Sequence, residues 1–123
     1  PPADYHNDHM AVSRCVLLAT QRCRGRTYDC DGEPCAPPRL YYSDAWFVPF
    51  EPDVYVPVGD QLQLKKQALE YHQSQLPERG DDDMVAMEMV RARYRGIEAA
   101  VGYAEAFRFV PRLGQRRVTE LLT

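Results

Sequence analysis

Proline and glycine are placed so that this chain can form only short helices and strands. The segment RGRTYDCDGEPCAPP, residues 24–38, holds two glycines and three prolines and predicts a surface loop. Pro49, Pro57, Pro77 and Pro111 interrupt the rest of the sequence. Because proline lacks a backbone N–H and clashes with the preceding helical turn, regular elements should end close to these points.

Between these breaks, three intervals show the apolar spacing that is typical of amphipathic helices. A polar residue with a short side chain stands ahead of the first two helices, and we expect Asn7 or Asp8 to cap one and Asp60 to cap the other. The helices are predicted over about residues 8–23, from Asp60 to Pro77 and over about 82–101, and a short last helix is predicted over about 114–122.

Three other segments favour strands because they are rich in aromatic and β-branched residues or alternate between apolar and polar. They are RLYYSDAWF at 39–47, DVYVPVG at 53–59 and YAEAFRFV at 103–110. Pro57 makes the second an edge strand or a strand end. Strands that alternate with helices predict an α/β fold, in which sites form where strands lead into helices.

The composition allows one small domain or part of a larger one, since 45% of the 123 residues are hydrophobic. The 15 basic residues are mixed among 18 acidic ones, which argues against nucleic acid or anionic membrane as a partner. No apolar run approaches the roughly 20 residues of a membrane span. We expect a cytoplasmic protein unless a targeting segment precedes Pro1.

The stretch DYHNDHMAV, residues 4–12, concentrates groups that could serve a metal site. A neutral His9 imidazole would be a good zinc ligand, and Asp4 or Asp8 could orient a histidine ring. His6 could donate to an oxyanion or protonate a leaving amine. The alternative is that Asp8 only caps the helix and both histidines are exposed. A catalytic zinc ion needs three protein ligands, and the sequence brings only two histidines together here.

Three stretches, taken in order, resemble one enzyme family. DYHNDHMAV is similar to the H-x-D-H motif of the PIG-L/LmbE-type N-deacetylases, and KKQALEYHQSQL at 65–76 is similar to their K-x-x-A-L-x-x-H-x-S-Q signature. RGIEAAVGYAEAF at 95–107 resembles the family's closing segment, in which a Tyr-Ala-Glu-Ala-Phe strand follows a helix. The resemblance covers about residues 1–110.

This resemblance implies a Rossmann-like fold and a zinc-dependent hydrolase that removes an acetyl or similar acyl group from N-acyl amino sugars, glycoconjugates or related N-acyl amines. His9 is the implied Zn²⁺ ligand. His6 and Asp8 are the implied catalytic residues, His6 stabilising the oxyanion or acting as general acid and Asp8 orienting a histidine through a hydrogen bond.

One part of the family pattern is missing. The family's Pro-His-Pro-Asp-Asp-Glu-like motif, which supplies two further zinc ligands and the general base, has no counterpart in residues 1–123, and Asn7 replaces a common proline. The chain is therefore expected to be the C-terminal part of a single deacetylase domain. Alone, it should neither hold zinc tightly nor turn over substrate, and its exposed apolar area could lead it to form a homo-oligomer.

Several other residues have both a functional and a structural interpretation. Trp46 could stack on a sugar ring, although paired aromatics in strands usually pack in cores. Glu105 could face the site or the core, and the second is favoured, in which case it should be buried and hydrogen-bonded. His72 should lie on a helix face that meets the sheet. Two rival functions stay open: a non-catalytic carbohydrate-binding or scaffolding relative, and a small metal-binding module that uses Cys30 and Cys35 with the histidines.

Overall fold

The computed structural model describes residues 1–25, 32–72 and 84–111. It divides into two compact units, of which unit 1 comprises residues 1–53 and 107–123 and unit 2 comprises residues 54–106. Within the described part of the chain, no helix is both long enough and apolar enough to cross a membrane. The expected last helix and the residues Ser74, Gln75 and Cys30 lie outside the described ranges.

Helix α1, Asn7–Arg22, is the main element of unit 1 and confirms the helix predicted over 8–23. Its N-cap is His6, so the prediction of Asn7 or Asp8 as the cap is wrong. His6 has an extended backbone, and its ring nitrogen accepts the hydrogen bond that a serine or aspartate oxygen would otherwise accept.

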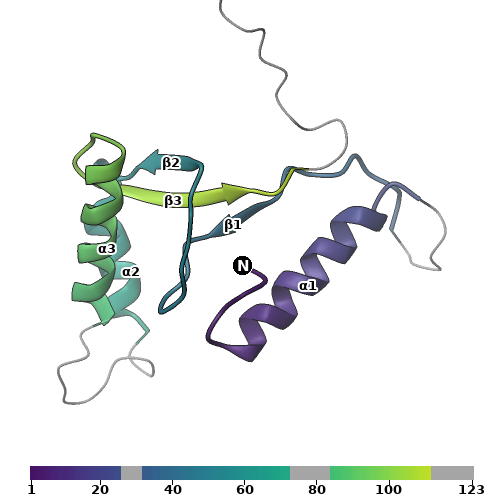
Figure 1. Ribbon diagram of the computed structural model, residues 1–123, viewed down its shortest axis with the longest axis horizontal. Helices are drawn as coiled ribbons and strands as arrows, with labels where there is room; N and C mark the ends of the chain where they lie inside the picture. The colour runs from purple at the N-terminus through teal and green to yellow at the C-terminus, as the bar shows by residue number, and fades with distance from the viewer. Residues whose placement is uncertain (26–31, 73–83, 112–123) are drawn as a thin grey trace, which may run out of the picture. The chain divides into compact units, whose positions relative to one another are not determined.

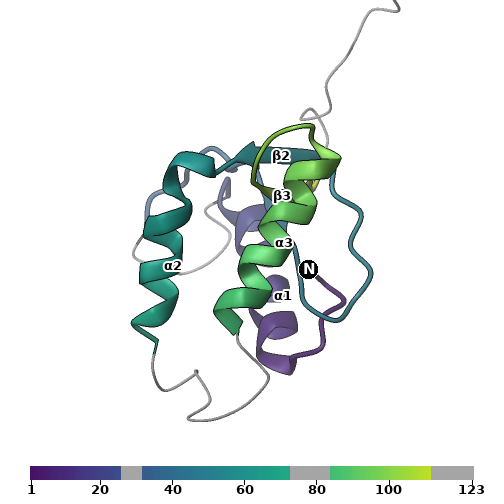
Figure 2. The same cartoon turned by 90° about the vertical axis from the view of Figure 1, so that its left-hand side faces the viewer.

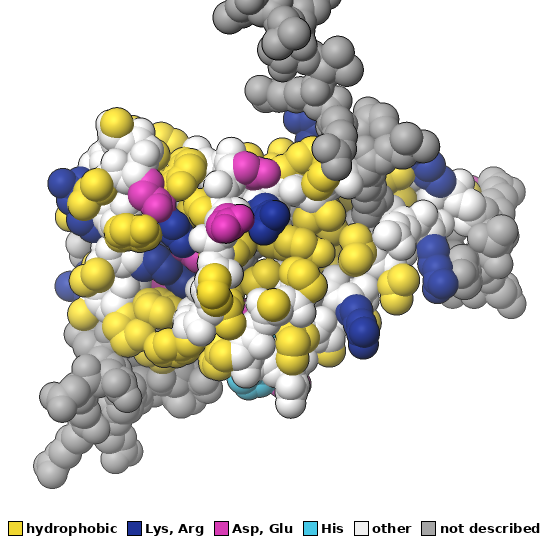
Figure 3. Space-filling model, viewed as in Figure 1, with side chains coloured by type: hydrophobic (Ala, Val, Ile, Leu, Met, Phe, Trp, Pro, Cys, Tyr) yellow, Lys and Arg dark blue, Asp and Glu magenta, His cyan; other side chains and the backbone are white. Residues whose placement is uncertain are grey.

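The apolar side chains of α1 are mostly uncovered. Thr20 is the one residue of the helix that is buried, whereas Val12, Val16 and Leu18 are exposed, Val12 by 61%. Hydrophobic side chains, yellow in Figure 3, reach the surface in many places on the face shown. Since helices in proteins gain most of their stability from burying an apolar face, α1 gains little from this source among the described residues.

Three short antiparallel strands form one sheet in the order β1-β3-β2 (Figure 1). They are β1 (Tyr41–Ser43), β2 (Val54–Pro57) and β3 (Ala104–Phe109), and β3 confirms the strand predicted over 103–110. Tyr41 lies opposite Phe109 in the register. Strand β2 ends at Pro57, as the missing N–H of proline requires.

The strand predicted over 39–47 is shorter than expected. It ends at Ser43, and Trp46 and Phe47 lie in a bend outside the sheet. Phe47 has a φ of 58°, which is in the left-handed region that residues other than glycine seldom adopt. This conformation is incompatible with a continuing strand. Aromatic enrichment therefore predicted the strand correctly at 41–43 but extended it too far.

Unit 2 contains a 3₁₀ turn, η1 (Gly59–Gln61), and two helices, α2 (Leu62–Glu70) and α3 (Met84–Glu98), which lie side by side (Figures 1 and 2). Helix α3 confirms the helix predicted over 82–101. Asp60 was expected to cap α2, but it belongs to the preceding turn, and the N-cap residue Gln61 makes no side-chain capping bond.

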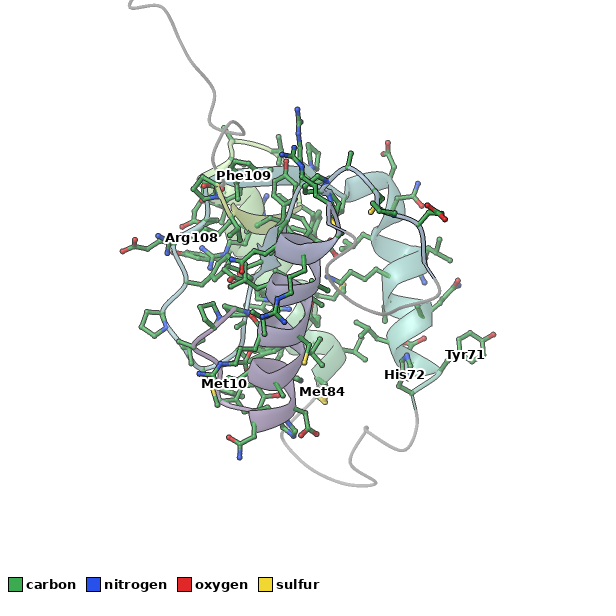
Figure 4. All side chains as sticks on the ribbon, turned by 90° about the vertical axis from the view of Figure 1, so that its right-hand side faces the viewer. Met10, Tyr71, His72, Met84, Arg108 and Phe109 are labelled. Carbon is green, nitrogen blue, oxygen red and sulfur yellow. The ribbon has the colours of Figure 1, made fainter. Side chains whose placement is uncertain are left out.

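Helix α2 ends earlier than predicted, at Glu70 instead of near Pro77. Tyr71 closes the last turn with a backbone hydrogen bond to the Gln67 carbonyl. Figure 4 shows Tyr71 and His72 at this end of the helix, with the Tyr71 ring pointing away from it. His72 is exposed, so the expectation that it faces the sheet is wrong.

The core of unit 2 forms where α3 meets the start of β3. Buried alanines allow the two backbones to approach closely, and Gly96 of α3 lies against the chain that leads into β3. A Cβ atom at Gly96 would stand 2.6 Å from the Gly102 carbonyl oxygen and 2.8 Å from the Tyr103 Cα. The buried apolar side chains are Val85, Ala92, Ala104 and Ala106.

The turn after α3 fixes this approach. The Val101 N–H donates to the Gly96 carbonyl at 2.8 Å and the Ala100 N–H donates to the Ile97 carbonyl at 3.1 Å, which together form a Schellman motif. Ala100 adopts the left-handed φ of 57° that this motif requires. The chain therefore reverses direction after α3, and Tyr103 leads directly into β3.

Charged side chains join three elements of unit 2. Lys65 of α2 donates to Glu88 of α3 at 3.0 Å and to Glu105 of β3 at 2.8 Å, and Arg91 also pairs with Glu88. Burial alone would lower the pKa of Lys65, but hydrogen bonds and the charges of the two carboxylates outweigh it and raise the pKa above its ordinary value. Glu105 is thus hydrogen-bonded and half-buried, close to the structural role expected for it.

Replacing Gly96 by alanine should destabilise the protein, because the new methyl group would collide with backbone atoms that cannot swing away. We expect G96A to lower the free energy of unfolding by about 1–3 kcal/mol in urea denaturation. G102A is the matched control, since a Cβ there meets nothing within 4 Å. It should change stability by less than about 0.5 kcal/mol. Equal effects of both variants would contradict the close approach at Gly96.

Lys65→Met should remove one of the two charged partners of Glu88, which is buried, and leave Arg91 as the other. The loss is expected to be about 1.5–3 kcal/mol of unfolding free energy. Because folding raises the pKa of Lys65, its contribution is fully present below the unfolded pKa of about 10.4 and fades as pH rises through the folded value. Lys66→Met, which removes an exposed pair with Glu70, should cost under about 0.5 kcal/mol. A K65M effect as small as that of K66M would contradict the network.

Candidate functional site

The site forms where the chain enters α1, and a buried carboxylate organises it. The Asp4 side chain is 4% exposed, and its Oδ1 accepts a hydrogen bond from the backbone N–H of His6 at 3.0 Å. The same oxygen lies 3.0 Å from Nδ1 of His9. Burial acts to raise the pKa of Asp4, but the hydrogen bonds from His6 and His9 and the charge of His9 lower it below its ordinary value. Asp4 is therefore an anionic acceptor.

The contact with Asp4 determines which nitrogen of His9 carries the proton. An ionised carboxylate can only accept hydrogen bonds, so Nδ1 of His9 must be the donor across the 3.0 Å contact. In the neutral ring this leaves Nε2 with a free lone pair. The His9 side chain is half-exposed, so this nitrogen has the chemistry of a metal ligand.

His6 has the opposite arrangement. Its Nδ1 accepts a hydrogen bond from the backbone N–H of Asp8 at 3.2 Å, which requires that Nδ1 be unprotonated. The neutral ring therefore carries its proton on Nε2, where it can donate. The two imidazoles stack with centroids 4.8 Å apart, and the Tyr5 ring lies edge-on to both. One stacked pair thus offers one donor nitrogen and one acceptor nitrogen.

The Asp8 carboxylate is placed differently from the role that the resemblance implies. Its side chain is 87% exposed, and Oδ2 lies 3.9 Å from Nδ1 of His6, which is too far for a hydrogen bond. It is the backbone N–H of Asp8 that orients His6, and Asp4 orients His9. Both aspartates lay within reach in the sequence, but spacing alone could not show which side chain turns back toward the histidines.

A pocket of about 440 Å³ in unit 1 contains the predicted metal ligand and the predicted sugar contact. Asp4, Asp8 and His9 line one part of it, and Trp46 lines another. Phe47, the residue after Trp46, anchors this part of the lining, because its ring makes an edge contact with Tyr5 at 5.5 Å between centroids. The other lining residues include Val12, Val16, Leu40, Tyr41 and Tyr42. Aromatic side chains beside polar groups suit a sugar ring.

Within the described ranges, no group of three histidine, cysteine, aspartate or glutamate side chains is arranged to hold a metal ion. His9 and His6 come together, as predicted, and His72 belongs to unit 2. A metal ion at His9 would therefore need ligands in addition to those that the described residues gather.

Cys23 and Cys35 lie next to each other, which the sequence did not indicate. Cys35 donates its backbone N–H to the Cys23 carbonyl at 2.8 Å, and the hydrogen bond and charge of the Cys23 thiol raise the pKa of Cys35. Both are free thiols. Cys30, the other cysteine of the predicted cysteine–histidine module, lies outside the described ranges.

No family model matches the chain, and no curated protein matches it. A solved structure does: the crystal structure of the conserved protein TT1542 from Thermus thermophilus is 27% identical, with a TM-score of 0.78. The match covers 96% of this chain and 53% of that one, so the chain spans about half the length of the solved structure. The two proteins share a mixed helix-and-strand architecture over this length.

Proposed function

We propose that this chain is the C-terminal part of a Rossmann-like, PIG-L/LmbE-type zinc-dependent N-deacetylase. Its substrate would be an N-acyl amino sugar, a glycoconjugate or a related N-acyl amine, from which it removes an acetyl or similar acyl group. The observation that carries this proposal is the hydrogen bonding of the stacked histidines, in which Nδ1 of His9 lies 3.0 Å from Asp4 and Nδ1 of His6 accepts the Asp8 N–H. These contacts leave the Nε2 lone pair of neutral His9 for a metal and the Nε2 proton of neutral His6 for donation.

The surroundings of His9 suit a zinc ligand. A histidine that binds zinc usually donates its other ring N–H to a carboxylate or carbonyl, and Asp4 fills that place here. When bound, a zinc ion would supply Lewis-acid polarisation of the amide carbonyl and activation of water. The contribution of this chain is to hold a half-exposed His9 ring against the Asp4 carboxylate, which is shielded from solvent.

The geometry distinguishes two roles for His6. With Nδ1 accepting the Asp8 N–H, neutral His6 can donate its Nε2 proton in a hydrogen bond to the oxygen that becomes negative as the amide carbon turns tetrahedral. To protonate the leaving amine, His6 would first need a proton on both nitrogens and would lose the bond from Asp8. A protonated Nδ1 would then have the Asp8 carboxylate nearby, at 3.9 Å. The arrangement described here favours the oxyanion role.

Two observations support a site that is completed by further polypeptide. The chain spans about half of the solved structure that it matches, and the apolar side chains of α1 around Val12 and Val16 are uncovered although they line the pocket. In the proposed enzyme, the missing segment would cover this surface and bring the remaining zinc ligands and the general base.

The isolated chain should bind zinc weakly, because His9 supplies a single strong ligand. After zinc loading and dialysis against metal-free buffer, metal analysis should find much less than one equivalent per chain. A complete protein that includes the preceding segment should retain one equivalent, and His9→Ala should remove it. A full equivalent held tightly by the isolated chain would overturn this account of the site.

Trp46 should contribute to substrate affinity more than to the chemical step. In the complete protein, Trp46→Ala removes the aromatic wall, and we expect the KM for an N-acetyl amino sugar to rise roughly tenfold with kcat little changed. Tyr71→Ala is the control, since Tyr71 is 86% exposed at the end of α2, in unit 2. A W46A enzyme with an unchanged KM would remove Trp46 from the substrate site.

A further inference from the structure

We infer that Asp4 is the positioning residue that holds His9 as its Nδ1–H tautomer and so directs the free Nε2 nitrogen toward the metal. The inference rests on the proposed function for the identity of the metal, but the tautomer itself can be measured on the chain alone. It assigns to Asp4 the orientation of the ligand histidine, whereas the resemblance assigns the orientation of a histidine to Asp8.

The Asp4 side chain is buried although Asp4 is acidic. Of the two carboxylates beside the histidines, Asp8 lies almost wholly in solvent and Asp4 is almost wholly shielded from it. Burying a carboxylate costs free energy unless hydrogen bonds compensate for the lost water. Asp4 receives that compensation from the His6 N–H and from Nδ1 of His9, so the ring contact is part of what keeps the carboxylate in place.

Capping of α1 does not explain the position of Asp4. Asp4 lies two residues before the N-cap, and the orphan N–H at Asp8 is already satisfied by the His6 ring. The bond from the His6 N–H to Asp4 is a local turn contact of a kind that aspartate and asparagine form equally well. The contact with His9 spans five residues and joins the turn to a ring on the helix, which a local turn does not require.

One oxygen therefore links the start of the helix to the orientation of the ligand. Because Oδ1 of Asp4 binds both the backbone of the cap residue and the ring of His9, the ring cannot rotate about its side-chain torsions without losing the Nδ1 contact. A fixed ring loses less conformational entropy when it binds a metal.

The direct test is the tautomeric state of each histidine, read from ¹⁵N chemical shifts and long-range ¹H–¹⁵N couplings of the chain at a pH where the rings are neutral. The wild type should show His9 as Nδ1–H and His6 as Nε2–H. Asp4→Ala should move His9 toward the Nε2–H form and leave His6 unchanged. Asp8→Ala is the matched control, because it keeps the backbone N–H that His6 uses, and it should alter neither ring.

Asp4→Asn separates positioning from folding, since asparagine can still accept the His6 N–H and preserve the turn. In the complete protein, Asp4→Ala should weaken zinc binding roughly 10- to 100-fold and Asp4→Asn should weaken it less, with unchanged helix content by circular dichroism. Zinc affinity that is equal in wild type and Asp4→Ala, or a wild-type His9 in the Nε2–H form, would overturn the inference.

The same experiments distinguish this inference from the proposed function. A wild-type complete protein that binds zinc through His9 but hydrolyses no N-acyl amine would contradict the deacetylase proposal, while the tautomer change and the affinity loss in Asp4→Ala would still support the role of Asp4. Conversely, an active deacetylase whose His9 tautomer and zinc affinity do not respond to Asp4→Ala would contradict only the role of Asp4.

Discussion

A single oxygen atom of Asp4 determines the arrangement at the start of α1. It accepts the N–H of His6, the residue that caps the helix, and it lies against Nδ1 of His9, one turn further along. Because the carboxylate is buried and ionised, both contacts are of the stronger, charge-assisted kind. The opposite proton positions on the two stacked rings follow from this oxygen and from the Asp8 N–H.

The two units differ in how completely they bury their own side chains. Unit 2 has a small core between α3 and β3, and the Lys65 network connects α2 to both. In unit 1, α1 buries one threonine and leaves its valines exposed. The chain spans about half the length of the solved structure that it matches.

The sequence predicted the regular elements better than it predicted their ends. Periodicity located α1, α3 and β3, because burial of one face repeats along the chain and is visible in the residues themselves. The caps were missed since an imidazole nitrogen replaced the expected aspartate or asparagine oxygen at His6, and Asp60 entered a 3₁₀ turn instead. The prediction that His72 lies on a helix face was wrong because α2 ends at Glu70. The sequence placed His6 and His9 together, and the structure stacks their rings, with Trp46 lining the same pocket as His9. The contact between Asp4 and His9 depends on a turn of the backbone that spacing does not reveal.

In the proposed enzyme, His9 and His6 form part of a zinc-dependent amide-hydrolysing site. The most direct measurement is the release of acetate from an N-acetyl amino sugar by the zinc-loaded complete protein, compared with its His6→Ala and His9→Ala variants. The account predicts turnover by the wild type, loss of both zinc and activity in His9→Ala, and a greatly reduced kcat with zinc retained in His6→Ala. A complete protein that binds zinc and the sugar but releases no acetate, or one whose activity survives His9→Ala, would contradict it.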